Sequence, residues 1–335
     1  MATYKGIQGY TVQKLATDPT ASEAIGQLWY NSGTGKFKIA TEGKGAWASV
    51  LFRSAGGAMV VGRNRLGGCG TSTAGLVVGG FPPGGAPNVG LTEEYDGSTW
   101  TEVTNYPVGT QSPGMAGTQT AALFISGGDY SPTASHTYNG STWTATGTRN
   151  ASGLLRCNGS GTQTAALTTG GETHPWTGYS NTTESYNGTA WTELAVYPIS
   201  SSEVQVMGTT SATIGVGGHP GAPGNKLVNI WNGASWTAGT NCNTGRSEFS
   251  SSHVGATSTS GIIFGGNSPL TGATEKWNGT SWTEVGDMAT ARSQLAGGGN
   301  SAAAIAMGGS AGGSITGATE AWADPVYAIK TVTVS

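Results

Sequence analysis

The sequence predicts an all-β fold: a six-bladed β-propeller closed by an N-terminal strand, with an N-terminal β-hairpin appended to it. Three observations predict this fold. A unit of 43–48 residues recurs along the chain, each unit holds two turn signals between short extended runs, and tryptophan recurs at one position of the unit. Four short strands at a period of about 40–50 residues are typical of a propeller blade.

The repeat is clearest at an apolar run that ends in a glycine pair. An aromatic residue follows each pair, and in five units a tryptophan comes five residues after that aromatic. The pairs begin at Gly79, Gly127, Gly170, Gly217, Gly265 and Gly308, the aromatics are Tyr95, Tyr138, Tyr186, Trp231, Trp277 and Trp322, and the tryptophans are Trp100, Trp143, Trp191, Trp236 and Trp282. The apolar run and the two aromatic positions therefore mark three strands of each unit.

Turn signals separate these strands. Asn-Gly or Asp-Gly stands between each aromatic and its tryptophan, as in Asn139-Gly140. These dipeptides favour hairpins because the turn needs a positive φ, which glycine adopts without strain. A second turn, clearest in residues 117–120 (Gly-Thr-Gln-Thr), precedes the apolar run. Each unit is therefore predicted to hold four strands.

The composition is unusual, yet it allows this core. Glycine accounts for 58 of 335 residues, charged residues for 10% and hydrophobic residues for 36%, values that resemble low-complexity disorder. The 11 tryptophans argue against disorder, because disordered chains are poor in aromatic residues. Each buried tryptophan removes roughly 150–250 Å² from water, so the two aromatic columns are expected to pack blade against blade.

The last unit is incomplete, because no Asn-Gly turn and no tryptophan follow Trp322. A tryptophan-led strand occurs instead near the N-terminus, in residues 45–50 around Trp47. We therefore expect residues 46–324 to form the propeller, with the Trp47 strand completing the sixth blade. Closure of this kind removes exposed sheet edges.

Two terminal segments do not share the repeat. Residues 1–45 contain a predicted hairpin, Leu28–Tyr30 with Lys36–Ile39, and residues 325–335 alternate like one more strand. An isolated hairpin is marginally stable in water, so we expect an attachment to another protein or another copy of the chain, with ordinary edge strands on the propeller as the alternative. The residues predicted to make this attachment are Leu28, Trp29, Tyr30, Phe37 and Ile39.

The apolar run, glycine pair, tyrosine and tryptophan together resemble the kelch repeat from residue 46 to about 324. The whole chain also resembles kelch-like structural proteins of tailed bacteriophages, in residues 4–8 (Tyr-Lys-Gly-Ile-Gln), in residues 26–39 and in the repeated Asn-Gly-Ser-Thr-Trp. The resemblance implies a virion appendage, a tail or head fibre, attached by its N-terminus with the propeller outward. The arginine common early in kelch blades occurs patchily, as Arg65, Arg156, Arg246 and Arg292.

The candidate binding surface lies in loops that differ among the units. In a propeller the second-to-third and fourth-to-first connections share one face; here they vary, while the turns of the other face repeat. The repeat does not explain Trp176, which stands in the longest such loop beside His174 and Tyr179. The other loop residues predicted to bind a ligand or receptor are Tyr130, Phe81 and His219. Alternatively, these aromatics fold back and pin a long loop.

Several other classes are disfavoured. A net charge of −3 with scattered Lys and Arg gives no basic stripe for nucleic acid. No apolar run approaches the ~18–20 residues that span a bilayer, and no signal peptide is evident. Cys69, Cys157 and Cys242 lack CxxC spacing, so we expect buried reduced thiols and no zinc site.

Two enzyme classes resemble parts of the pattern. Galactose oxidase resembles a kelch propeller with copper bound by Tyr and His, but the four histidines here fall in four different units. Sialidases share six blades and a turn that residues 96–100 nearly match, yet the arginine cluster and paired acids of glycosidic chemistry are not apparent. We therefore expect no enzymatic activity, no metal and no cofactor.

The interpretation is a non-enzymatic virion protein, assembled in the host cytoplasm, that contacts a host-surface glycan or protein through the variable loops. Its other expected partners are virion proteins bound through residues 1–45, and self-association stays open. Two alternatives remain: a purely architectural decoration or connector protein, and a glycan-active or copper-oxidase propeller.

Overall fold

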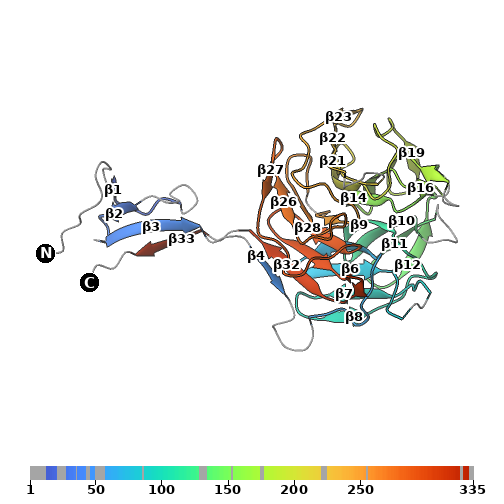
Figure 1. Cartoon of the computed structure of the whole chain (residues 1–335), viewed down its shortest axis with the longest axis horizontal. Coiled ribbons are helices and arrows are strands. Elements are labelled where there is room, and N and C mark those ends of the chain that lie inside the picture. Colours follow the sequence, from blue (N-terminus) through green and yellow to red (C-terminus); the bar gives the residue numbers. More distant parts are fainter. Residues whose placement is uncertain are drawn as a thin grey trace. The chain divides into compact units, whose positions relative to one another are not determined.

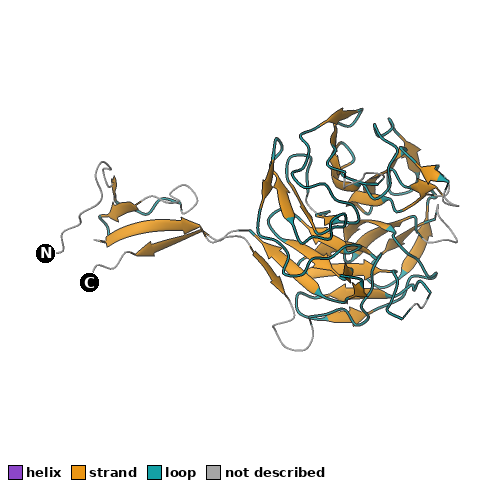
Figure 2. Ribbon diagram, in the orientation of Figure 1, coloured by secondary structure: helices purple, strands orange, loops and turns teal. Residues whose placement is uncertain are grey.

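The computed structural model describes residues 13–20, 28–34, 36–42, 46–49, 57–84, 87–127, 134–151, 154–173, 177–219, 225–253, 256–324 and 327–331. All regular structure in these ranges is β (Figure 2). The chain divides into two compact units: residues 46–323 form the larger unit, and residues 1–45 with 324–335 form the smaller one (Figure 1). The predicted all-β class is confirmed.

Four-stranded antiparallel sheets, six among the described residues, make up most of the larger unit, an arrangement compatible with a β-propeller (Figure 1). Five contain β5 (Gly67–Thr71), β6 (Ala74–Val78), β7 (Thr92–Tyr95) and β8 (Trp100–Glu102); β9 (Gly114–Thr118), β10 (Ala121–Ile125), β11 (Ser135–Tyr138) and β12 (Trp143–Thr146); β14 (Asn158–Thr162), β15 (Ala165–Thr169), β18 (Thr183–Tyr186) and β19 (Trp191–Glu193); β20 (Gln205–Thr209), β21 (Ala212–Val216), β22 (Val228–Trp231) and β23 (Trp236–Ala238); and β24 (Ser250–Ser251), β25 (Gly261–Phe264), β26 (Thr274–Trp277) and β27 (Trp282–Glu284). The sixth contains β28 (Ala296–Gly299), β29 (Ala304–Met307), β32 (Thr319–Ala323) and β4 (Ala46–Ser49). Loop residues add two small sheets: β13 (Leu154–Leu155), β16 (Glu172–Thr173) and β17 (Gly178–Tyr179); and β30 (Ser310–Ala311) with β31 (Ser314–Ile315).

The sixth sheet takes its fourth strand from the other end of the larger unit. β4 pairs antiparallel with β32, and Trp47 lies opposite Trp322 in the register. The first sheet has the same register, with Tyr95 opposite Trp100. The predicted pairing of the Trp47 strand with the last repeat is therefore confirmed.

The Asn-Gly and Asp-Gly turns owe their shape to two side-chain properties. The glycine takes the left-handed backbone, with a φ of 93° at Gly97 and 89° at Gly140, as predicted. The residue before it acts through its side chain: Asn139 Oδ1 accepts the N–H groups of Ser141 and Thr142 at 3.0 and 2.9 Å. The turn is thus a four-residue loop with one left-handed position.

The tryptophans join neighbouring sheets, as predicted, through packing and also through hydrogen bonds. Trp282 donates its indole Nε1–H to the carbonyl oxygen of Thr240 at 3.0 Å. In the other four repeat tryptophans, the indole Nε1–H donates to the side-chain hydroxyl of the first residue of the third strand in the preceding sheet. These bonds are Trp100 to Thr319, Trp143 to Thr92, Trp191 to Ser135 and Trp236 to Thr183, at 3.0–3.3 Å. One of them joins the first sheet to the sixth, so this contact repeats across the two ends of the unit.

Several glycines of the first strands are required by the close approach of the first strands of neighbouring sheets. A Cβ at Gly68 in β5 would lie 2.6 Å from the Cβ of Ala296 in β28. A Cβ at Gly114 in β9 would lie 2.7 Å from the carbonyl oxygen of Cys157, just before β14. Real Cβ atoms do not approach so closely, so these strands accept side chains at few positions.

The smaller unit is one sheet built from both ends of the chain: β1 (Gln13–Leu15), β2 (Leu28–Asn31), β3 (Lys36–Glu42) and β33 (Tyr327–Thr331). The predicted hairpin is confirmed as β2 and β3, with Leu28 opposite Ile39. The C-terminal strand finds its partner here, because β33 pairs with β3. Trp29 is buried in this unit and donates its indole N–H to Asp18 at 3.1 Å.

Buried arginine–glutamate ion pairs link the segment before a sheet to its third strand. In the described residues they are Arg63–Glu93, Arg149–Glu184, Arg246–Glu275 and Arg292–Glu320, at 2.5–3.0 Å. Two of the four arginines expected from the kelch resemblance, Arg65 and Arg156, do not occupy this position; Arg63 and Arg149 take it instead. The expectation fails because Arg65 follows Arg63 by two residues and Arg156 follows Arg149 by seven, so each stands closer to the first strand and in a different environment.

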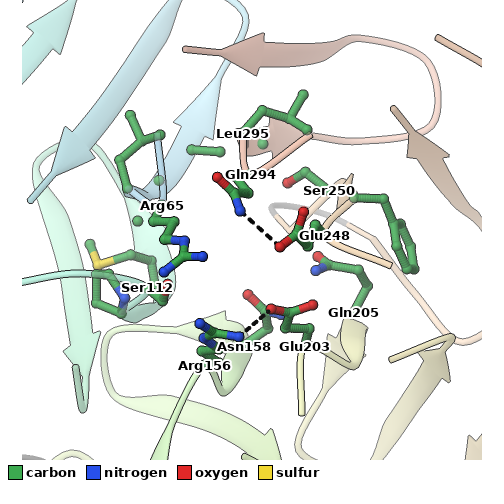
Figure 3. Close-up of a pocket in the computed structure, with 18 of the residues that line it drawn as sticks. Arg65, Ser112, Arg156, Asn158, Glu203, Gln205, Glu248, Ser250, Gln294 and Leu295 are labelled. Carbon is green, nitrogen blue, oxygen red and sulfur yellow. Dashed lines mark hydrogen bonds and ion pairs between the residues drawn. The ribbon is translucent and has the colours of Figure 1, made fainter. Parts of the chain in front are cut away.

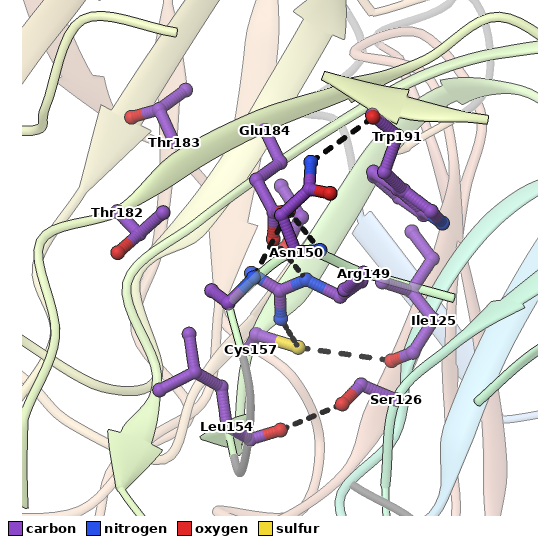
Figure 4. Close-up of polar contacts among 12 residues, drawn as sticks. Ile125, Ser126, Arg149, Asn150, Leu154, Cys157, Thr182, Thr183, Glu184 and Trp191 are labelled. Carbon is purple, nitrogen blue, oxygen red and sulfur yellow. Dashed lines mark hydrogen bonds and ion pairs between the residues drawn. The ribbon is translucent and has the colours of Figure 1, made fainter. Parts of the chain in front are cut away.

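Figure 4 shows one such pair in detail. Arg149 donates through Nε to Glu184 at 2.6 Å and through Nη1 to Cys157 Sγ at 3.3 Å, and its guanidinium lies 6.0 Å from the centre of the Trp191 ring. Glu184 also accepts the backbone N–H of Asn150 at 2.7 Å. The carboxylate therefore fixes both the arginine and the backbone beside it.

The second sheet replaces this ion pair by a neutral one. Tyr106 stands six residues after its tryptophan, as Arg149 does, and His136 takes the strand position of Glu184. The Tyr106 hydroxyl lies 3.0 Å from His136 Nδ1, and its ring meets the Trp143 ring edge-on at 5.4 Å. An ion pair in one sheet and a neutral hydrogen-bonded pair in another thus occupy equivalent positions.

This substitution pattern predicts the effect of removing one partner. Glu184→His leaves the Arg149 charge buried without its carboxylate and is expected to lower the free energy of unfolding by about 3–5 kcal/mol. The double variant Arg149→Tyr/Glu184→His reproduces the Tyr106–His136 pair and is expected to recover most of that loss. Urea unfolding followed by tryptophan fluorescence measures both. A double variant as unstable as the single one would show that the two pairs are not equivalent.

Candidate functional site

The six sheets share one unusual backbone position. The residue two places before the first strand of each sheet has a left-handed backbone, although none of these residues is glycine. We call them the pre-strand residues: Arg65, Ser112, Arg156, Glu203, Glu248 and Gln294, with φ values of 47–60°. This conformation costs a non-glycine residue about 1–2 kcal/mol, so its repetition indicates one constraint common to all six sheets.

Hydrogen bonds between their backbones provide that constraint. The N–H of a pre-strand residue donates to the carbonyl of the pre-strand residue in the preceding sheet. The bonds present are Ser112 to Arg65 at 2.6 Å, Glu203 to Arg156 at 2.8 Å, Gln294 to Glu248 at 2.8 Å and Arg65 to Gln294 at 2.9 Å. The last of these joins the first sheet to the sixth.

The pre-strand residues line a cavity of about 70 Å³ (Figure 3). In Figure 3 the guanidinium groups of Arg65 and Arg156 point inward from one side, and the carboxylates of Glu203 and Glu248 lie on the other. This volume holds a small polar group rather than a whole sugar ring. The cavity therefore offers cationic donors on one side and anionic acceptors on the other.

Most of these charges already have partners. Arg156 forms ion pairs with Glu203 and Glu172, both at 3.4 Å. Glu248 accepts from Gln294 Nε2 at 2.8 Å and from Asn267 Nδ2 at 3.2 Å. These contacts hold the carboxylates at fixed positions in the cavity wall.

Arg65 differs from Arg156. Among the described residues no carboxylate lies within ion-pair distance of it; it donates to Gln111 Oε1 at 3.4 Å, and its guanidinium lies 6.0 Å from the centre of the Phe81 ring. Burial lowers the pKa of Arg65, and the charge of Arg156 lowers it further, while the charges of nearby glutamates oppose this. Arg65 thus presents a cation that no adjacent carboxylate neutralises.

Two titratable groups in the wall have displaced pKa values. Burial, with repulsion from Glu248, raises the pKa of Glu203 to about 7 despite the opposing charge of Arg156. Burial lowers the pKa of His253 to about 4, so this side chain is neutral at ordinary pH. The charge of the cavity therefore changes near neutral pH through Glu203.

Three of the loop residues predicted to bind a ligand lie beside this cavity. Phe81 pairs by backbone hydrogen bonds with Asn64, next to Arg65, and His219 pairs in the same way with Ser202, next to Glu203. Tyr179 in β17 lies opposite Glu172, and its ring is 5.3 Å from that of His219. The structure thus brings Tyr179 and His219 together and places Phe81 against Arg65.

The remaining predicted residues are elsewhere. His174, Trp176 and Tyr130 lie outside the described residues. The residues predicted for attachment belong to the smaller unit, where Leu28, Trp29, Tyr30, Phe37 and Ile39 stand in β2 and β3. Their binding roles stay predictions.

Sequence reasoning missed the pre-strand residues as a set. They recur every 44–47 residues, always two places before the first strand. Their side chains differ in type, so no residue motif marks them; only the position relative to the Gly-Gly repeat could have found them. Arg65 and Arg156 were noticed, but as members of the kelch pattern.

Comparisons with known proteins add no identification, since no family model and no curated protein matches the chain. Among the described residues, no three or more His, Cys, Asp or Glu side chains are grouped so as to hold a metal ion. No helix in the same ranges has the length and apolar character to cross a bilayer.

The displaced pKa of Glu203 predicts how stability varies with pH. The unfolded state loses this proton near the ordinary value of 4.5 and the folded state near 7, so stability falls as pH rises between these values. Glu203→Gln removes this loss and is expected to be more stable than the wild type by about 1–3 kcal/mol above pH 7, and equal to it near pH 4. Urea unfolding at pH 4 and pH 8.5 measures the difference. Equal stabilities at pH 8.5 would contradict the burial argument; the exposed Glu193→Gln is the matched control.

Proposed function

We propose that the larger unit is a closed six-bladed β-propeller of the kelch type. Three observations support closure. β4 completes the sixth sheet, the Trp100 indole donates to Thr319, and the Arg65 N–H donates to the Gln294 carbonyl. The last two contacts repeat ones that join consecutive sheets elsewhere, as a ring of equivalent blades requires.

We further propose that the protein is a non-catalytic recognition protein that binds a molecule of a cell surface at the mouth of this propeller. The observation that carries the proposal is the set of pre-strand residues: one backbone conformation, six times, with four different side-chain types around a cavity. A scaffold that keeps its backbone and varies its inward side chains is typical of a binding site. Tyr179, His219 and Phe81 extend the surface with aromatic faces.

A role on the virion of a tailed bacteriophage is the setting we propose for this binding. Its support is the sequence resemblance to kelch-like phage proteins together with the separate sheet formed by the two chain ends. In this proposal the smaller unit attaches the protein to the particle. Many copies on one particle would multiply a weak single-site affinity.

A second candidate, a glycan-cleaving enzyme, has one observation in its favour. Glu203 and Glu248 line the same cavity, and the pKa of Glu203 is raised to about 7. Glycosidases use a carboxyl group with a raised pKa as the acid and a second carboxylate beside it as the base or nucleophile. Detection of reaction products separates this candidate from simple binding.

The test is binding of the full-length protein to immobilised bacterial lipopolysaccharides and capsular polysaccharides, followed by biolayer interferometry. We expect saturable binding to at least one polysaccharide and no released oligosaccharide by mass spectrometry. Tyr179→Ala is expected to weaken binding about tenfold, or ~1.4 kcal/mol, because it removes an aromatic face at the cavity mouth. Thr192→Ala, on the exposed edge strand β19, is the matched control.

Each contrary outcome points to one alternative. Binding with released product would favour the glycan-cleaving enzyme. Absence of binding to the whole panel would overturn the recognition proposal and favour an architectural role. Equal binding by Tyr179→Ala and the wild type would remove the loop aromatics from the binding surface.

A further inference from the structure

The most distinctive feature of the cavity is that Arg65 forms no ion pair with any of the described residues. Its side chain is half-buried and points into the cavity, and no carboxylate of the described residues is close enough to form an ion pair with it (Figure 3). Among its charged neighbours, the second cation Arg156 has the largest effect on its pKa, which it lowers. A partly buried guanidinium without an adjacent counter-ion is costly, and an anionic group bound there would offset the cost.

We infer that the cavity binds the carboxylate of an acidic sugar, such as a uronic or sialic acid, and that Arg65 is the residue that pairs with it. This inference rests on the proposed function, because it names the ligand class of the same site. Arginine suits the role because its planar guanidinium can donate two parallel hydrogen bonds to one carboxylate.

The rest of the wall favours a single carboxylate with hydroxyl groups beside it. On the side opposite to Arg156, the Glu248 carboxylate accepts hydrogen bonds and the Gln294 amide can donate them. A sugar hydroxyl can donate to the first and accept from the second. The carboxylates of Glu203 and Glu248 would repel a ligand that places more than one negative charge inside the cavity, such as a phosphate dianion. The Phe81 ring beside Arg65 offers an apolar face for a sugar.

The size of the cavity agrees with this occupant. About 70 Å³ accommodates a carboxylate and the atoms next to it, and the rest of a sugar chain would lie at the mouth. Tyr179 stands opposite Glu172 in its sheet, and His219 pairs with Ser202, the residue before Glu203. One charged group would thus enter the cavity while neighbouring sugars contact the loops.

The test uses two ligands that differ only in this charge: trigalacturonate and its uncharged methyl ester, titrated into the full-length protein by calorimetry. We expect the acid to bind at least tenfold more tightly than the ester. Arg65→Gln is expected to abolish this preference, and it should fold, because Gln294 has the same left-handed backbone at the equivalent position. Lys226→Gln removes an exposed positive charge from the same unit and is expected to keep the preference. The methyl glycoside of N-acetylneuraminic acid, tested alongside, distinguishes sialic from uronic acids.

The pH dependence gives a second readout with a defined sign. The charged or titratable groups that line the cavity with Glu203 are Arg65, Arg156, Glu248 and His253, and Glu172 forms an ion pair with Arg156. Protonation of Glu203 removes one negative charge near the ligand, so affinity for trigalacturonate is expected to rise as pH falls from 8 to 6. Glu203→Gln is expected to bind equally tightly at both values.

Two results would overturn the inference. One is equal affinity for the acid and the ester; the other is an Arg65→Gln variant that keeps the tenfold preference while circular dichroism shows it folded. Binding of neutral polysaccharides with no preference for the acid would refute the carboxylate site and leave the recognition function standing. Absence of binding to the acid, the ester and the whole polysaccharide panel would refute both.

Discussion

The close contact between the first strands of neighbouring sheets is the constraint on which the larger unit depends. It leaves no room for a Cβ at Gly68 or Gly114, which accounts for the glycine-rich first strands. The backbone turns before each of these strands: six non-glycine residues take a left-handed conformation, and four backbone hydrogen bonds join one of them to the next. The cavity is the consequence, because the side chains at this turn have only the space between the sheets to occupy.

Positions in the repeat of the larger unit fall into two groups: those that stabilise the fold keep their residue type, and the others vary. The repeat tryptophans and the turn glycines recur almost unchanged, and four of the tryptophan indoles make the same contact with the preceding sheet. The buried pairs tolerate one exchange of chemistry, from Arg149–Glu184 to Tyr106–His136. The pre-strand residues tolerate almost any polar side chain, because their contribution to the fold is made by the backbone.

The sequence was sufficient for the strands and for one long-range pairing. Asn-Gly chemistry marks the turns, and the missing tryptophan of the last unit pointed to the strand at Trp47. The partner of the C-terminal strand was not predictable, because alternation identifies a strand without saying what lies beside it; the partner is β3. The cavity was not predictable for a different reason. Residue type does not reveal a left-handed backbone when the residues that adopt it are as different as Ser112 and Glu203. Of the loop residues, Tyr179 and His219 do meet, while the sequence alone could not relate them to Arg156 and Glu203.

The central claim is that six equivalent sheets close into a ring, and distances between alternate sheets test it most directly. Thr101, Thr192 and Thr283 are exposed and occupy the same position in the fourth strands β8, β19 and β27, and the native cysteines of the described residues are buried. Each pair can therefore be replaced by cysteine and spin-labelled for double electron–electron resonance. A closed ring predicts three equal distances. A distance between the labels at 101 and 283 that clearly exceeds the other two would show an open arrangement and contradict the claim.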